Sequence, residues 1–301
     1  MPLLDKARLV IVTGKGGVGK SCISAAIAQA SAKKGLRTLV CEVNAKERIA
    51  PLLGKPEAGP EITSLEENLW ACDVRPANAM REYALMILKF ETIYNAVFEN
   101  RLVRYFLRFI PSLQELVMLG KILFHLREVR DDGTWRFDRI VIDAPATGHA
   151  ITFFSVPQVI LDTVPPGSLA TDARWMRDLL TDPKTTATVL VSLPEEMPVN
   201  ETFELAEALA QRVHMKPAAA VLNGFIEPRF EEQELAVLAA HPRLFAIAQG
   251  HEERAHLAAR ERTRLAGLGV PLTVAPRLYK ESFGRAAVEE LAAHLTKGGL
   301  L

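Results

Sequence analysis

Residues 12–21 read VTGKGGVGKS and have the residue types and spacing of a phosphate-binding loop. The stretch fits the pattern G-x-x-x-x-G-K-[ST], follows an apolar run and precedes a helical pattern. In such loops, backbone N–H groups surround the phosphates, the lysine amine reaches the β- and γ-oxygens, and the serine hydroxyl ligates Mg²⁺. The predicted nucleotide contacts are Gly14, Gly16, Gly17, Val18, Gly19, Lys20, Ser21 and Cys22, with Ser21 also a Mg²⁺ ligand.

A second charged group follows a later apolar run. The segment FDRIVIDAPATGHA places Asp143 at the end of an expected strand, before a loop that contains His149. A carboxylate at that point, beside the phosphate loop, can hold a water bound to Mg²⁺. Asp143 is therefore the second predicted metal-site residue. His149 has two open interpretations, a hydrogen bond that reports phosphate state and a structural hydrogen bond to a neighbouring loop.

Lys15 is a second lysine in the loop, although the motif needs only Lys20. The stretch KGGVGKS resembles the deviant loop of the ATPases that include nitrogenase iron protein, partition and septum-site ATPases, and arsenical-pump and tail-anchored-protein-targeting ATPases. The resemblance implies that Lys15 reaches across a homodimer interface to the nucleotide of the other subunit. A cation there would stabilise charge on the transferred phosphoryl group. The alternative is a solvated loop lysine.

Two later segments narrow the resemblance. DAPATGHA is similar to the DTAPTGHT switch of the arsenical-pump and tail-anchored-targeting branch, and the similarity extends over most of the chain. VLNGF and VAPRLYKESFG fall where that branch places its adenine contacts, which implies Asn223 and Pro276 as nucleotide-binding residues. The resemblance thus implies ATP as the nucleotide.

One position departs from the branch pattern. CEVNAKERIA occupies the place where the branch typically has STDPAH, whose aspartate orients the attacking water, and the alignment puts Asn44 there. An asparagine can hold a water by hydrogen bonds but cannot accept its proton. We expect Asn44 to act at this site and ATP hydrolysis to be slow, unless Glu42 or Glu47 substitutes for the missing carboxylate.

The elements that must position these residues alternate along the chain. Short β-branched runs followed by longer amphipathic segments predict a doubly wound, mostly parallel α/β sheet. We expect one P-loop ATPase domain over residues 1–301, with residues 76–130 and 150–182 forming a helical subdomain inserted after the second and third strands. The prolines near 157–166 prevent the second stretch from being one continuous helix.

Residues 80–129 hold more large apolar side chains than one helix stripe needs. Three readings stay open: packing within the subdomain, a groove for an apolar helix of a client protein, and membrane contact beside Arg101, Arg104 and Arg108. In the targeting ATPases the corresponding helices form an apolar groove across the dimer. We therefore expect this protein to contact a membrane only indirectly.

Composition excludes several partners. Among 301 residues, 36 Lys and Arg balance 36 Asp and Glu, so nucleic acid is not an expected partner. Cys22, Cys41 and Cys72 lie far apart without a CxxC pair, so we expect no zinc clamp, no disulfide framework and no arsenite site. The apolar run before the loop is too short for a signal peptide or membrane span, which favours a cytoplasmic protein.

The resemblance implies a Mg²⁺- and ATP-dependent homodimeric switch that alternates between closed and open dimers and thereby binds and releases an apolar or protein client. The alternative is a localisation or regulatory ATPase of the partition or septum-site type, in which the ATP-bound dimer is a binding platform. The C-terminal segment FGRAAVEELAAHLTKGGLL carries little positive charge and does not resemble the basic membrane anchor of septum-site ATPases.

Overall fold

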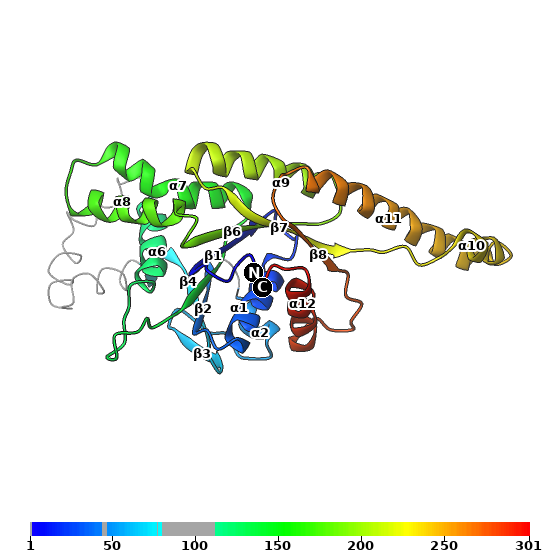
Figure 1. Ribbon diagram of the computed structural model, residues 1–301, viewed down its shortest axis with the longest axis horizontal. Helices are drawn as coiled ribbons and strands as arrows, with labels where there is room; N and C mark the ends of the chain where they lie inside the picture. Colours follow the sequence, from blue (N-terminus) through cyan, green and yellow to red (C-terminus); the bar gives the residue numbers. More distant parts are fainter. Residues whose placement is uncertain (1, 44–46, 77, 80–111) are drawn as a thin grey trace.

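The computed structural model describes residues 2–43, 47–76, 78–79 and 112–301. Its centre is an eight-stranded sheet in the order β3-β4-β2-β5-β1-β6-β7-β8 (Figure 1). All neighbouring strands are parallel except the β3–β4 pair, which is antiparallel. The strands are β1 Leu9–Gly14, β2 Thr38–Val43, β3 Thr63–Glu66, β4 Leu69–Val74, β5 Arg139–Asp143, β6 Thr186–Ser192, β7 Pro217–Phe225 and β8 Leu272–Pro276.

Helices cover both faces of the sheet. The helices within the described residues are α1 Lys20–Lys33, α2 Ile49–Leu52, α6 Leu113–Phe124, α7 Thr147–Thr163, α8 Ser168–Thr181, α9 Glu196–Ala208 continued by a π-helical turn Leu209–Val213, α10 Glu232–Leu238, α11 Pro242–Ala266 and α12 Arg285–Lys297. In Figure 1, α1, α2 and α12 lie on one face, and α6 to α9 lie on the other. Each face therefore has its own hydrophobic core.

Strand β1 shows how the sequence builds both cores. Its residues are all buried, and Leu9 and Ile11 pack in the core with α6 to α9, whereas Val10 and Val12 pack in the core with α1 and α12. Successive side chains of a strand point to opposite faces, so a continuous apolar strand must be covered twice. The same register sets Val12 beside Asp143 of β5, which brings the carboxyl ends of these strands together. Ligands of open α/β sheets bind at this edge.

The predicted doubly wound fold is confirmed, but the strand count is higher than the sequence indicated. β3 and β4 form a tight hairpin at Asn68, which has a left-handed φ of 57°; β3 (TSLE) is short and polar, whereas β4 (LWACDV) is mostly apolar and buried. The helix α6 consequently follows the fourth strand of the chain. The second helical stretch is divided as expected, because α7 and α8 are separate helices, although Pro157 lies within α7.

Some of the predictions concern residues that the structure does not describe. These residues are Asn44 and the range 80–111, which includes Arg101, Arg104 and Arg108. The subdomain boundaries and the apolar groove therefore remain predictions. Within the described part of the chain, none of the helices has the length and hydropathy needed to cross a membrane.

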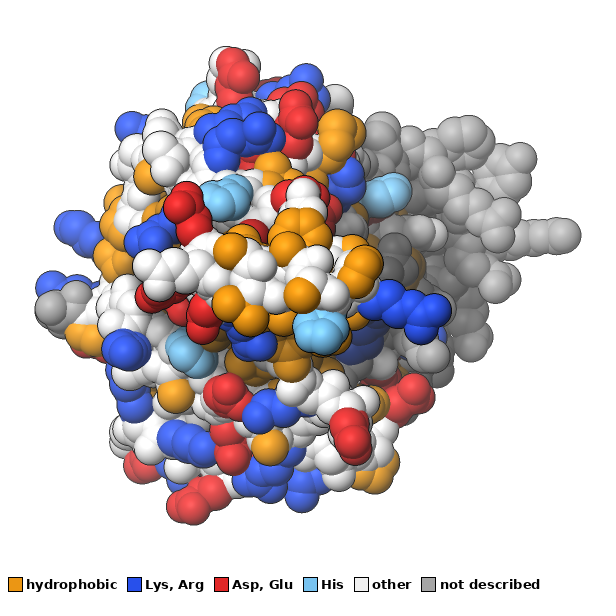
Figure 2. All heavy atoms as spheres, turned by 90° about the vertical axis from the view of Figure 1, so that its right-hand side faces the viewer, with side chains coloured by type: hydrophobic (Ala, Val, Ile, Leu, Met, Phe, Trp, Pro, Cys, Tyr) orange, Lys and Arg blue, Asp and Glu red, His pale blue; other side chains and the backbone are white. Residues whose placement is uncertain are grey.

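The hairpin of α10 and α11 projects from the sheet and forms the end of the molecule farthest from α8 (Figure 1). Figure 2 views this end and shows hydrophobic side chains gathered at its centre. Val237, Leu244 and Ile247 are 73%, 53% and 69% exposed there. None of the side chains of α10 is buried. Exposed apolar patches of this kind are common at contact surfaces.

Candidate functional site

The phosphate loop connects β1 to α1, and two of its glycines have no room for a side chain. Gly19 has a φ of +93°, and a Cβ there would lie 2.3 Å from Nδ2 of Asn223. A Cβ on Gly14 would lie 2.3 Å from the carbonyl oxygen of Val191. Backbone conformation and close neighbours both require glycine at these positions. The motif spacing thus has a direct steric cause in the folded chain.

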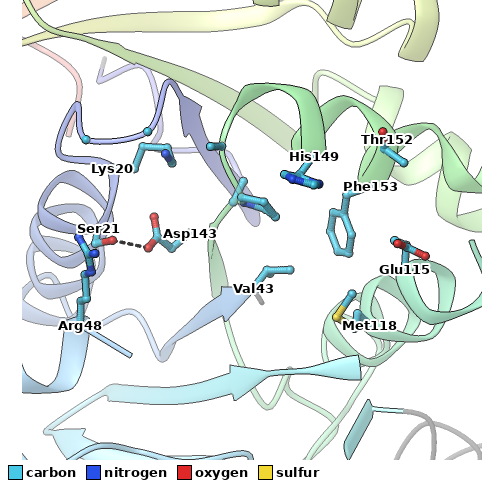
Figure 3. A pocket seen from close by; sticks show the side chains of 15 residues that line it. Lys20, Ser21, Val43, Arg48, Glu115, Met118, Asp143, His149, Thr152 and Phe153 are labelled. Atoms are coloured by element: carbon cyan, nitrogen blue, oxygen red, sulfur yellow. Dashed lines mark hydrogen bonds between the residues drawn. The ribbon is translucent and has the colours of Figure 1, made fainter. Parts of the chain in front are cut away.

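Ser21 and Asp143 meet at the edge of the sheet, as their positions in the sequence predict. The Ser21 hydroxyl donates a hydrogen bond of 2.7 Å to Oδ2 of Asp143 (Figure 3), and the Ser24 hydroxyl donates one of 3.1 Å to Oδ1. A hydroxyl and a carboxylate are hard oxygen donors, the type that Mg²⁺ prefers. These two side chains therefore fit a Mg²⁺ site, with Ser21 as ligand and Asp143 beside it.

The charges at this edge influence one another. Burial raises the pKa of Asp143, and the serine hydrogen bonds and the Lys20 ammonium oppose that rise. Burial lowers the pKa of Lys20, whereas Asp143 opposes that fall. The Lys20 ammonium donates a hydrogen bond of 2.9 Å to the carbonyl oxygen of Lys15. A phosphate group here would give this half-buried ammonium a far stronger acceptor than a carbonyl.

A cavity of about 370 Å³ opens in front of the loop (Figure 3). The loop and Asp143 form one wall, and the segment after β5 with α6 and α7 forms the other. That second wall includes Pro145, His149, Phe153, Glu115 and Met118. A group bound in this cavity would lie next to the segment that follows β5 and next to α6 and α7.

His149 points into this region from the first turn of α7 and is exposed. Within the described residues its ring makes no hydrogen bond, so the structural role considered above has no support there. Its position next to the cavity suits a contact with the bound group.

A second cavity lies on the other side of the start of α1. It is lined by Gly19, Cys22, Arg48, Leu52 and Phe283, among others. Cys22 is half-buried rather than buried, and burial raises the pKa of its thiol to about 11, so it is a protonated wall residue. The two cavities flank the phosphate loop and suit the two ends of a nucleotide.

The two residues predicted to contact adenine, Asn223 and Pro276, differ in their contact with the phosphate loop. Asn223 donates a hydrogen bond of 2.9 Å from Nδ2 to the carbonyl oxygen of Val18, so it contacts the loop directly. Pro276 ends β8 beside Phe225 of β7 and lines neither of the two cavities. The structure thus brings Asn223 to the loop and leaves Pro276 at the neighbouring strand end.

Lys15 is separate from the other loop cation. Its ammonium lies 2.5 Å from Oε1 of Glu201 on α9, and the two side chains are 34% and 27% exposed. Lys15 lines neither cavity, whereas Lys20 lines both. The sequence analysis missed Glu201, because the two residues are 186 positions apart and no local pattern links them.

The carboxylates near Asn44 are held by backbone groups. Glu42 accepts hydrogen bonds from the N–H groups of Arg48 at 2.7 Å and of Ile49 at 3.2 Å, and burial raises its pKa to about 7. Oε1 of Glu47 accepts the N–H of Gly59 at 3.0 Å. Neither glutamate lines the cavity that contains Asp143. Each carboxylate thus has a backbone partner of its own outside that cavity.

Several known proteins are similar to this chain in sequence. The sequence profile of the anion-transporting ATPases matches residues 7–165, more than half of the chain. ATPase BagA of Mycobacterium tuberculosis is 31% identical over 245 residues, which cover 77% of this chain and 69% of that protein.

More distant relatives are much longer than this chain. A Halobacterium salinarum protein, named provisionally as an arsenical pump-driving ATPase, is 26% identical over 73% of this chain and 36% of its own length. ATPase ARSA1 of Chlamydomonas reinhardtii is 25% identical over 71% of this chain and 30% of its own length. The chain thus spans about a third of these two proteins. With its phosphate loop, its Ser21–Asp143 pair and the match over residues 7–165, the chain belongs to the anion-transporting ATPase family.

Proposed function

We propose that this ATPase is a Mg²⁺-dependent homodimeric switch in which Lys15 of each protomer completes the nucleotide site of the other. The observation that carries the proposal is the separation of the two loop lysines. Lys20 lines the cavity that holds Asp143, whereas Lys15 lies outside both cavities and contacts α9. A cation on the outer side of the loop is available to a facing copy of the same site.

The chemistry follows from the charges. Hydrolysis of ATP moves negative charge onto phosphoryl oxygens, and of the two loop lysines only Lys20 lines the cavities of its own protomer. Bound Mg²⁺ would neutralise part of the phosphate charge, with Ser21 as ligand and Asp143 beside it. A lysine that arrives only in the dimer would make hydrolysis depend on assembly, as an added arginine does in other phosphoryl-transfer enzymes.

The expected output is movement of the helical layer. The cavity in front of the phosphate loop is lined by His149 at the start of α7 and by Glu115 and Met118 of α6. Loss of the γ-phosphate would remove contacts between the nucleotide and these helices. We propose that the dimer thereby binds and releases an apolar helix or another protein segment in the cytoplasm.

The nucleotide assignment is tested by calorimetric titration with ADP and with a non-hydrolysable ATP analogue, both with Mg²⁺. We expect Lys20→Ala to abolish binding, because the β- and γ-charges lose their in-loop cation. Lys216→Ala, at an exposed lysine after the π-helical turn, is the matched control and should bind as the wild type does. Unchanged affinity in Lys20→Ala would contradict the assignment.

The client assignment needs a separate experiment. Protein loaded with the ATP analogue is mixed with an apolar helical peptide, with anionic lipid vesicles or with duplex DNA, and co-sedimentation or pull-down is compared with the ADP state. We expect retention of the peptide in one nucleotide state. Nucleotide-dependent binding to vesicles or DNA without peptide binding would contradict the client role and favour a localisation ATPase.

A further inference from the structure

Arg48 occupies an unusual place at the nucleotide site. The two cavities beside the phosphate loop share four lining residues, Gly17, Lys20, Ser21 and Arg48. Three of them belong to the loop itself, and the fourth comes from the segment between β2 and α2. Figure 3 shows the Arg48 side chain lying beside Ser21 at the start of α1. A group that passes from one cavity to the other therefore passes Arg48.

Hydrogen bonds to the Glu42 carboxylate fix the backbone at Arg48. Its N–H donates a hydrogen bond of 2.7 Å to Oε1 of Glu42, and the next residue, Ile49, donates to both oxygens of the same carboxylate at 3.2 Å. Glu42 is the last residue but one of β2 and pairs in register with Asp143. The sheet edge that positions the metal-site carboxylate thus also positions the main chain of Arg48.

The guanidinium of Arg48 is exposed and, within the described residues, makes no ion pair or hydrogen bond. Its positive charge acts on the site nonetheless, because it helps to lower the pKa of Asp143 against burial and also lowers the pKa of Lys20. An arginine offers a planar set of donors that matches two phosphate oxygens at once. Because no carboxylate of the described residues pairs with it, this guanidinium is available to a phosphate group.

We propose that Arg48 is a second phosphate-binding cation within each protomer, and that its guanidinium contacts the α- and β-phosphate oxygens between the two cavities. The inference rests on the proposed nucleotide site. The lysine of a phosphate loop serves the β- and γ-oxygens. The second cavity is lined by Cys22 and by no residue of the segment 144–149, so the oxygens that Arg48 would reach between the two cavities are those of the α- and β-phosphates.

This role differs from that of Lys15 in a measurable way. Arg48 contacts phosphates present in both ADP and ATP and acts within a monomer, whereas Lys15 acts on the nucleotide of the other protomer. Substitution of Arg48 should therefore weaken both nucleotides to a similar degree at protein concentrations where no dimer forms.

The test is calorimetric titration of monomeric Arg48→Gln with Mg²⁺ and either ADP or a non-hydrolysable ATP analogue. We expect about tenfold weaker binding of both nucleotides, since one charge-assisted bidentate contact is lost. Arg48→Lys should recover part of the loss, because it restores the charge without the planar fork. Arg243→Gln, an exposed arginine on the projecting hairpin, is the control and should bind as the wild type does.

Two further readings separate a binding role from a structural one. The thermal midpoint of unfolding without nucleotide should be the same for wild type and Arg48→Gln, and the affinity of the variant should depend less on salt concentration. Unchanged ADP affinity in a folded Arg48→Gln variant would overturn the inference while leaving the nucleotide site intact. Failure of the wild type to bind either nucleotide would contradict the proposed function and this inference together.

Discussion

The ammonium of Lys15 lies 2.5 Å from Oε1 of Glu201, so the extra lysine of the phosphate loop is tied to α9 of its own protomer. Both side chains are about one-third exposed, and pairs of this kind contribute about 1 kcal/mol or less. A lysine that acts on another protomer must leave this carboxylate or share it. The pair therefore competes weakly with dimer formation.

The first prediction concerns that competition. Glu201→Gln frees Lys15, and we expect ATP-dependent dimers at about two- to fivefold lower protein concentration, the effect of a weak ion pair. Analytical ultracentrifugation with the ATP analogue measures this directly. Glu204→Gln, an exposed glutamate on the same helix, should change nothing. Loss of the dimer in Glu201→Gln would instead show that this carboxylate is part of the interface.

The second prediction concerns Asn44. Asn44→Asp restores a carboxylate where the family pattern has one, and we expect turnover to rise at least several-fold, about 1 kcal/mol off the barrier. Steady-state phosphate release at saturating ATP and Mg²⁺ compares the variant with wild type. Because Glu42 and Glu47 accept backbone N–H groups, we expect that neither already replaces the missing carboxylate.

An unchanged rate of turnover in Asn44→Asp would contradict this prediction. Equal rates for wild type and Asn44→Asp would mean that residue 44 is not at the water site or that a glutamate already acts there. A further loss of turnover in Glu42→Gln or Glu47→Gln would identify that glutamate.

The third prediction tests the steric basis of the loop. Gly19→Ala forces a Cβ against the Asn223 amide and onto a backbone with φ of +93°, so we expect at least tenfold weaker nucleotide binding. The double variant with Asn223→Ala removes the clash but not the backbone strain and should recover only part of the affinity. Gly269→Ala, at φ of +76° with open space around it, is the control and should retain full affinity.

The fourth prediction is a pH dependence of stability. Burial raises the pKa of Glu42 from 4.5 to about 7. Between these values the folded protein holds a proton that the unfolded chain has lost, so this group makes stability fall as pH rises through the window, by about 3 kcal/mol at most. Below pH 4.5 and above pH 7 its effect is constant.

Glu42→Gln cannot titrate, so the variant should gain stability relative to wild type as pH rises from about 4.5 to about 7. Urea unfolding at several pH values, without nucleotide, gives the comparison. Glu204→Gln, at an exposed position, should run parallel to wild type. Parallel profiles for Glu42→Gln would show that this carboxyl titrates normally in the folded state.

Local spacing was enough to predict where the loop and Asp143 lie. The loop is defined by contiguous residues between β1 and α1, and a charge at the end of an apolar strand predicts that Asp143 lies beside Ser21, where the structure has it. Glu201 and Arg48 reach the loop only through the packing of α9 and the β2–α2 connection, which no periodicity in the sequence reveals. The sequence did not indicate β3 and β4, because β3 is short and polar and β4 is a short apolar run without a helical segment directly before it. Pairing with β2 and with each other decides their conformation.

The central claim is that Lys15 acts across a dimer, and sedimentation velocity of wild type and Lys15→Ala with ADP or the ATP analogue tests it most directly. We expect wild type to be monomeric with ADP and dimeric with the analogue, and Lys15→Ala to bind the analogue with near-normal monomer affinity while dimerising and hydrolysing ATP poorly. A Lys15→Ala protein that dimerises and turns over ATP as the wild type does would show that Lys15 is an ordinary surface lysine.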